Sequence, residues 1–393
     1  MDTSVLPIAA FILTAIGWLS REIWRWRKAK RLATEDAAKT LVQKKGLLEE
    51  MISKTQDTNS KKMLLSELEE AKAALLGLYG RRLRQTLKDA GLPTEEELVA
   101  NGRRQLEPQQ ATHLREVTAE VKSLLPFVSA DDLLVLGNAY YHMGQYEDAK
   151  AICDRILNLN PDDPAILNNR GVAYAELSEY DKALADFNHS LELRPDDPGT
   201  LSNRGLAYAK LERYEEALAD FNRSLEFKPD EPTILYNRAS TYGDIGRYNE
   251  ALADYNRSIE LRPDDPSTLN NRGTDYFKLE KYDEALADYN RSLELRPDHP
   301  DTLTNRGLAY AKLERYDEAL ADFNRSLELR PDDSGTLYNL ACLFSLWGKT
   351  DDALTYLEKA IDKDKKYREK AKTDKDFDNI RDDPRFKKLI ESD

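Results

Sequence analysis

The stretch PGTLSNRGLAYAKLERYEEALADFNRSLEFKPDE, residues 198–231, returns in near-copy along most of this chain of 393 residues. One proline near the end of each copy marks a period of 34 residues, at Pro161, Pro195, Pro229, Pro263, Pro297 and Pro331. A fixed period of this size is typical of a solenoid, in which each unit packs only on its neighbours. We therefore expect an array of stacked units instead of a few globular domains.

The most strictly repeated positions have helical spacing. When units are counted from residues 130, 164, 198, 232, 266, 300 and 334, position 4 is leucine, position 8 glycine or alanine, position 11 aromatic and position 20 alanine. Positions 4, 8 and 11 share one face of a first helix, and positions 20, 24, 27 and 28 share one face of a second. Asp163, Asp197 and Asp265 each precede a proline, as an N-cap residue does at the start of a helix.

This pattern resembles the tetratricopeptide repeat family over residues 130 to about 363. The resemblance implies an all-α fold, a right-handed α-solenoid of seven 34-residue helix-turn-helix repeats whose first helices line a concave groove. We assign residues 130–367 to the seven repeats. Residues 368–393, with Phe377 and Phe386 at helical spacing, are expected to form C-terminal capping helices.

The N-terminus predicts a membrane anchor over residues 1–27. Residues 5–19 carry no charge, and a basic, tryptophan-rich flank with Arg21 and Arg25 follows. Because positive flanks stay on the cytoplasmic side, we expect a single-pass protein with its N-terminus outside and its repeats in the cytoplasm, most simply at a bacterial inner membrane. A cleaved signal and a helix lying in the interface are the alternatives.

Residues 28–129 are expected to connect this anchor to the repeats. Apolar residues at helical spacing predict a hairpin of two helices, about 34–54 and 61–90, and two further helices from residue 94 and over about 110–125. The hairpin is either a stalk or dimerising coiled coil, or an N-terminal cap folded onto the first repeat.

The five middle units carry a pair of charged residues that the two outer units lack. The family usually has a large apolar residue at position 7, but these units have arginine there and aspartate at position 23, whereas the outer two units have neither. We predict an ion pair between the two helices of each middle unit, the alternative being copies of an ancestral unit without contact. The pairs are Arg170–Asp186, Arg204–Asp220, Arg238–Asp254, Arg272–Asp288 and Arg306–Asp322.

The resemblance also implies which residues face the groove, namely positions 2, 5, 6, 9, 12 and 13. An amide offers two donors and an acceptor, so a row of asparagines at position 6 is predicted to bind an extended peptide, unless these side chains are merely solvated. They are Asn169, Asn203, Asn237, Asn271, Asn305 and Asn339. The predicted aromatic anchors among them are Tyr141, Tyr236, Phe277 and Tyr338.

Composition and motifs narrow the function. The formal net charge of −14 argues against nucleic-acid binding, which needs a basic face. Cys153 and Cys342 are expected to be packing residues, and the sequence shows no catalytic, phosphate-binding or metal-binding motif. We therefore predict a non-enzymatic, membrane-anchored adaptor or scaffold without metal or cofactor, whose groove binds a protein or peptide. The alternatives are a structural assembly protein that oligomerises through residues 34–90, and a regulatory subunit of an enzyme complex.

Overall fold

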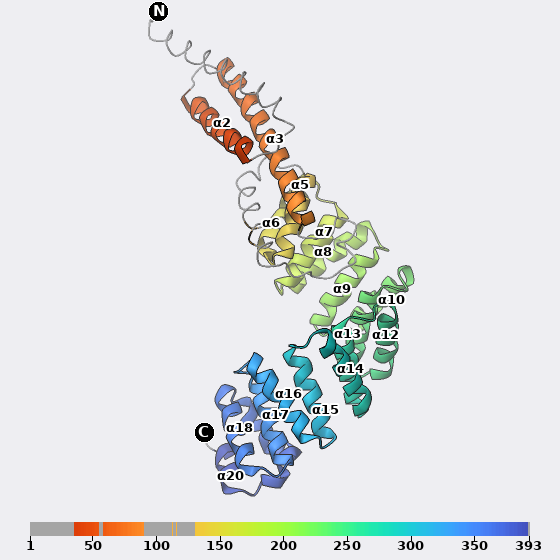
Figure 1. Cartoon of the computed structure of the whole chain (residues 1–393). Helices are drawn as coiled ribbons and strands as arrows, with labels where there is room; N and C mark the ends of the chain where they lie inside the picture. The colour runs from red at the N-terminus through yellow and green to blue at the C-terminus, as the bar shows by residue number, and fades with distance from the viewer. Residues whose placement is uncertain (1–34, 55–57, 90–111, 113–114, 116–129, 392–393) are drawn as a thin grey trace, which may run out of the picture. The chain divides into compact units, whose positions relative to one another are not determined.

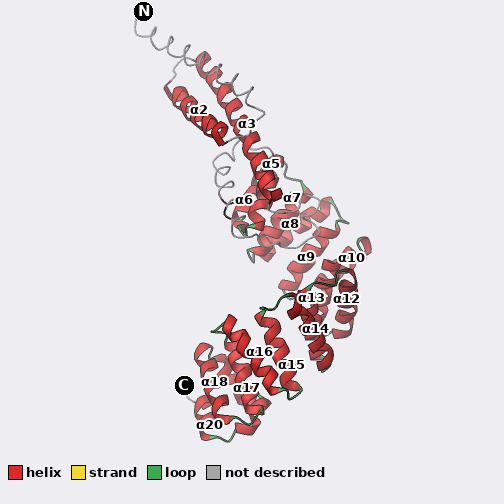
Figure 2. Cartoon of the chain, viewed as in Figure 1, coloured by secondary structure: helices red, strands yellow, loops and turns green. Residues whose placement is uncertain are grey.

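The computed structural model describes residues 35–54, 58–89 and 130–391, together with the isolated positions 112 and 115. All described elements are helices joined by turns (Figure 2). The chain divides into two compact units, Met1–Leu193 and Arg194–Asp393. Figure 1 labels most of their helices. The anchor predicted at residues 1–27 and the helices predicted from residue 94 to about 125 lie outside the described ranges. Within those ranges, no helix has the length and apolar character needed to cross a bilayer.

The first compact unit holds a helical hairpin and two repeats. Its described helices are α2 (Glu35–Lys54), α3 (Thr58–Asp89), α5 (Ala130–His142), α6 (Tyr146–Leu159), α7 (Pro164–Glu176) and α8 (Tyr180–Leu193). Helices α2 and α3 form the predicted hairpin with nearly the predicted bounds, and Leu48 and Leu64 are buried between them. Leu41 and Leu75, from the same hairpin, join one core with Leu133 of the first repeat. The hairpin therefore packs on α5, as an N-terminal cap does.

The second compact unit holds five repeats and the capping segment. Its helices are α9 (Pro198–Lys210), α10 (Tyr214–Phe227), α11 (Pro232–Asp244), α12 (Tyr248–Leu261), α13 (Pro266–Lys278), α14 (Tyr282–Leu295), α15 (Pro300–Lys312), α16 (Tyr316–Leu329), α17 (Ser334–Leu346), α18 (Thr350–Lys363), α19 (Lys366–Thr373), the 3₁₀ helix η2 (Lys375–Ile380) and α20 (Pro384–Glu391). Each odd-numbered helix from α9 to α17 packs on the helix that follows it, forming one repeat, and each repeat packs on the next.

Most of the described first helices start at a side-chain cap, and α11 is an exception because the side chain of Glu231 makes no such bond. The carboxylate of Asp163 accepts hydrogen bonds from the backbone N–H groups of Ala165 and Ile166, and the carboxylate of Asp197 accepts one from that of Thr200. Asp265 caps α13 in the same way, so the three predicted caps are confirmed. Each cap satisfies backbone donors that have no partner within the helix.

Glycine at position 8 allows the two helices of a repeat to approach closely. A Cβ atom on Gly205 would lie 2.8 Å from a ring carbon of Phe221, and one on Gly307 would lie 2.7 Å from the ring of Phe323. Both rings are fully buried. The aromatic side chain therefore packs directly on the glycine backbone, as the small residue at this position predicts.

All five predicted arginine–aspartate pairs are in contact. Each arginine donates from Nε and a terminal nitrogen to both carboxylate oxygens of its partner, as Arg238 does to Asp254 at 2.7 Å for each bond. Asp254 is 8% exposed, and these bonds raise the pKa of Arg238. Such bidentate pairs are the form in which a buried carboxylate is best compensated.

The same arginines also join neighbouring repeats, which the sequence did not predict. The remaining terminal nitrogen of Arg238 donates to Asn222 Oδ1 of the preceding second helix at 2.7 Å. Arg272 and Arg306 make the equivalent bond to Asn256 and Asn290. In these repeats the arginine thus connects three helices.

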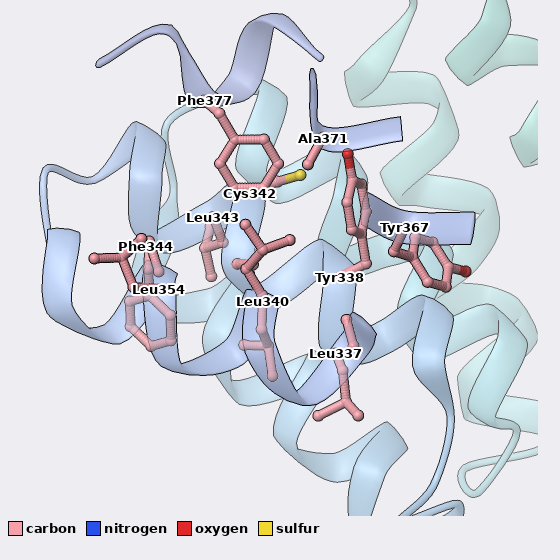
Figure 3. Packing of buried hydrophobic residues seen from close by; sticks show 14 of the residues in the cluster. Leu337, Tyr338, Leu340, Cys342, Leu343, Phe344, Leu354, Tyr367, Ala371 and Phe377 are labelled. Atoms are coloured by element: carbon pink, nitrogen blue, oxygen red, sulfur yellow. The ribbon is translucent and has the colours of Figure 1, made fainter. Parts of the chain in front are cut away.

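The C-terminal segment covers the last repeat, as predicted for a cap. Phe377 and Phe386 are fully buried with their ring centroids 5.4 Å apart. Figure 3 shows Phe377 and Ala371 above Cys342, with Tyr338 beside Tyr367. These apolar side chains close the core where no further repeat follows.

Candidate partner-binding face

The first helices of the second compact unit form one continuous layer. Helix α9 contacts α11, α11 contacts α13, α13 contacts α15, and α15 contacts α17. We call the layer formed by these five helices the first-helix layer. Most of the side chains predicted to face a groove belong to it.

A chain of hydrogen bonds runs across three helices of this layer. The Asn305 amide of α15 donates to Asn270 Oδ1 at 3.2 Å, and Asn270 donates to Asn271 Oδ1 at 3.2 Å. Asn271 in turn donates to Tyr236 Oη of α11 at 2.9 Å. Asn305 and Asn271, both predicted to grip a peptide, are therefore linked here through Asn270, and Asn271 is bonded to Tyr236. Their contacts hold adjacent repeats in register and preorganise the layer.

The other predicted amides have different environments. Asn237 is 7% exposed and is thus largely withdrawn from the surface. Asn203 and Asn339 are half-buried in α9 and α17, and Asn169 is half-buried in α7 of the first compact unit. The amide row of the sequence analysis is therefore partly a structural network and partly surface.

One predicted aromatic anchor is misplaced. Tyr338 is 1% exposed, its ring stacks on Tyr367 at a centroid distance of 4.7 Å, and its hydroxyl donates to Asp374 Oδ2 at 2.7 Å (Figure 3). The capping segment covers it, so it cannot line a groove. This correction follows from residues 36 positions further along the chain, a separation at which no local pattern operates.

The other predicted aromatics remain partly exposed. Tyr236 lies beside Tyr255, and Phe277 packs edge-on against Tyr282 at 5.3 Å. Tyr141, in the first compact unit, donates from its hydroxyl to Glu176 at 3.3 Å. Each ring is thus held in place by its own neighbours while part of its surface faces solvent, as suits an anchor for a partner.

The fourth and fifth repeats carry polar residues that the sequence analysis missed. Ser240 and Thr274 replace a mostly apolar position 9, and Thr241 and Asp275 replace the usual alanine at position 10. In the same two repeats, tyrosine replaces phenylalanine at position 24, and the hydroxyl of Tyr289 donates to Thr274 at 3.3 Å. The joint departure from the repeat consensus was the available signal.

One group of side chains has the composition of a metal site. Donor atoms of Cys342, Asp374 and Asp376 lie within 4.8 Å of one another. However, Asp374 accepts a hydrogen bond from Tyr338, and Asp376 pairs with Lys312 at 3.6 Å. These contacts explain the carboxylates as part of the capping segment. Cys153 and Cys342 are both buried free thiols, as packing residues should be.

Comparison with family models identifies the repeats. One tetratricopeptide repeat model matches residues 136–200, and a second matches residues 196–264, 230–298, 264–332 and 300–366. The chain belongs to the tetratricopeptide repeat family. Comparison with curated protein sequences gave no significant match.

Solved tetratricopeptide repeat structures share the fold at low identity. The Cut9 and Hcn1 hetero-tetramer of the APC/C matches with a TM-score of 0.57 and 17% identity, over 91% of this chain and 64% of that one. YrrB, described as a TPR protein with an unusual peptide-binding site, matches with a TM-score of 0.40 and 24% identity over 48% of this chain and 96% of its own. PilF of Pseudomonas aeruginosa matches with a TM-score of 0.47 and 16% identity, over 53% of this chain and 96% of its own. At these identities the likeness concerns the fold.

Proposed function

We propose that this protein is a non-enzymatic scaffold that binds a protein or peptide partner on its first-helix layer. Tetratricopeptide repeat proteins are in general interaction scaffolds, which supports this role at a coarse level. The observation that carries the finer proposal is the hydrogen-bond chain from Asn305 to Tyr236, which holds three first helices in register. A preorganised surface loses less conformational entropy when a partner binds.

The third repeat offers a matched pair of substitutions that tests the binding surface. Leu206 of α9 in the first-helix layer is 36% exposed, and Phe227 at the end of α10 is 48% exposed. In proximity labelling with the full chain, Leu206→Glu should lose the labelled partner because it places a carboxylate on the binding layer. Phe227→Glu introduces the same group on a second helix and should keep the partner. Identical labelling by both variants would reject the first-helix layer as the binding surface.

We further propose that residues 1–27 anchor the scaffold in a membrane with its repeats in the cytoplasm, most simply at a bacterial inner membrane. The uncharged run at residues 5–19 and the basic flank after it support this. The full chain should remain in membranes washed with carbonate, and a chain lacking residues 1–27 should be released. Release of both chains by carbonate would contradict the anchor.

A second candidate function is assembly through the α2–α3 hairpin. Val42, Leu47, Met63 and Leu65 of these helices are between 43% and 49% exposed, so four large apolar side chains of the hairpin are available to a second copy. A chain lacking residues 1–33 should then sediment as an oligomer, and Leu47→Glu with Met63→Glu should make it a monomer. If the chain without these substitutions is monomeric at micromolar concentration, assembly through the hairpin is rejected.

A further inference from the structure

Asp275 is an unusual residue within the first-helix layer. It occupies position 10 of α13, where the third and sixth repeats have Ala207 and Ala309 and the fourth has Thr241. Asp275 is 6% exposed, and its Oδ2 atom is buried without a hydrogen-bond partner. Buried carboxylate oxygens are nearly always bonded, so an unpartnered one calls for a group that the chain itself does not supply.

A glycine in the adjacent helix makes room for this carboxylate. A Cβ atom on Gly243 of α11 would lie 2.9 Å from Asp275 Oδ1 and 3.1 Å from Oδ2. Repeats three and six have Ala209 and Ala311 at the position of Gly243. Two neighbouring repeats therefore each replace an alanine of the repeat pattern, one by Asp275 and the other by Gly243, and the two new residues lie side by side. Because Gly243 is only half-buried, the carboxylate lies close to the surface of the layer.

A second carboxylate stands next to that glycine. Asp244 is exposed at the end of α11, and its negative charge acts on Asp275. Burial first, and Asp244 second, raise the pKa of Asp275 to about 7, and among the residues that the structure describes no cation acts to lower it. Lys210 is the cation that acts on Asp244. Small polar side chains, including Ser240 and Thr274, occupy the same two helices.

We propose that Asp275 and Asp244 form a subsite for one basic side chain, lysine or arginine, of a peptide bound to the first-helix layer. The cation would supply the missing partner of the buried carboxylate and would offset the repulsion between the two acids. Rotation of the carboxylate about its Cβ–Cγ bond can present either oxygen to the surface. The net charge of −14 further favours a basic partner. This subsite rests on the proposed peptide-binding function.

Selection from a random dodecapeptide library displayed on phage, with the full chain immobilised, tests the subsite. Wild type should select peptides that share a lysine or arginine at one fixed position. Asp275→Asn keeps the shape of the side chain but removes its charge, so it should select peptides without this preference. Asp317→Asn, at an exposed aspartate of α16, makes the same change of charge elsewhere and should select as wild type does.

A direct affinity measurement sharpens the result. A selected lysine peptide should bind wild type at least about tenfold more tightly than its norleucine copy, because a close pair of charges is coupled by more than a factor of ten. The two peptides should bind Asp275→Asn with similar affinity, and circular dichroism should show that this variant is folded.

The possible failures are distinguishable. If wild type and both variants select no peptide, the proposed function fails and the subsite with it. If peptides are selected without a basic preference, or with one that survives Asp275→Asn, the subsite is rejected while peptide binding stands. Equal affinity of the lysine and norleucine peptides for wild type would likewise overturn the subsite.

Discussion

Charged residues of the middle repeats occupy two positions where the last repeat has leucine. At position 7, Arg238 of the fourth repeat donates to a buried aspartate, whereas Leu340 of the seventh repeat is fully buried among apolar side chains. At position 10, Asp275 of the fifth repeat is buried with a raised pKa, whereas Leu343 of the seventh is packed in the terminal core.

The difference follows from what covers each repeat. The fourth, fifth and sixth repeats each have a neighbour on both sides within the second compact unit, and these neighbours supply hydrogen-bond partners such as Asn222 for Arg238. The last repeat is covered by α19, η2 and α20, which supply the rings of Phe377 and Phe386. Polar groups can be buried where the next copy of the unit offers a partner, and a terminal repeat requires an apolar cover.

The largest expected effect comes from removing the apolar cover. Phe386→Ala should destabilise the last repeat by roughly 3–5 kcal/mol, because it leaves a cavity beneath Phe377 in a fully buried site. Hydrogen exchange should show early opening of α17 and α18, with α11 to α14 little changed. Lys388→Ala, at an exposed residue of the same helix, is the control. Uniform opening of all repeats would contradict a local cap.

The next effect concerns pH and the fifth repeat. Burial raises the pKa of Asp275 from 3.8 to about 7, so between these values the folded chain holds a proton that the unfolded chain has lost. Stability should therefore fall as pH rises from about 4 to 7, by as much as about 4 kcal/mol. Urea unfolding of wild type and Asp275→Asn at pH 5 and pH 8 checks this. The variant should lose less stability, and equal losses would place the pKa of Asp275 near its ordinary value.

Replacing the charged pair of a middle repeat by the apolar residues of an outer repeat tests the ion pair. Asp254→Ile alone should destabilise by about 2–3 kcal/mol, since it leaves the charge of Arg238 unpaired in a largely buried site. Adding Arg238→Leu copies Leu136 and Ile152 of the first repeat and should recover most of the loss. A double-mutant cycle by urea unfolding gives the coupling energy. Purely additive losses would show that the observed contact contributes nothing.

The smallest effect concerns the turn between the two helices of each repeat. Glu280 of the fifth repeat adopts a φ of 59°, whereas the seventh repeat has Gly348 at a φ of 77°. This left-handed conformation suits glycine, so Glu280→Gly should stabilise by about 1 kcal/mol and Gly348→Ala should destabilise by a similar amount. Thermal unfolding measures both changes. Shifts of the same sign in both variants would contradict backbone strain as their cause.

The repeating features could be predicted because local chemistry creates them. Proline after Asp163 or Asp197 starts a helix, and glycine opposite an aromatic ring brings two helices together. The contact between positions 7 and 23 was also accessible, because arginine and aspartate occur there together in five units, as Arg238 and Asp254 do, and both are missing from the outer two. Seven copies of one unit made such joint departures visible within a single sequence.

The surface of the first-helix layer could be predicted only in part. Asn271 and Tyr236 were expected to contact a partner, yet they hydrogen-bond to each other across 35 residues. Asp275 and Gly243 were overlooked because each is ordinary alone and informative only as a pair. Their proximity depends on the contact between α11 and α13, which cannot be inferred from the pattern within one unit.

By itself, the sequence determined the period, the helix pairs, their caps and the paired arginines and aspartates, because these depend on residues within one unit. Only the tertiary structure decided which polar groups remain available to a partner. In the folded chain, Tyr338 lies beneath the capping segment, Asn305 is hydrogen-bonded to Asn270, and Asp275 Oδ2 has no partner. The physical reason is that burial and hydrogen bonding between repeats depend on how neighbouring units stack, which brings together residues more than 30 positions apart.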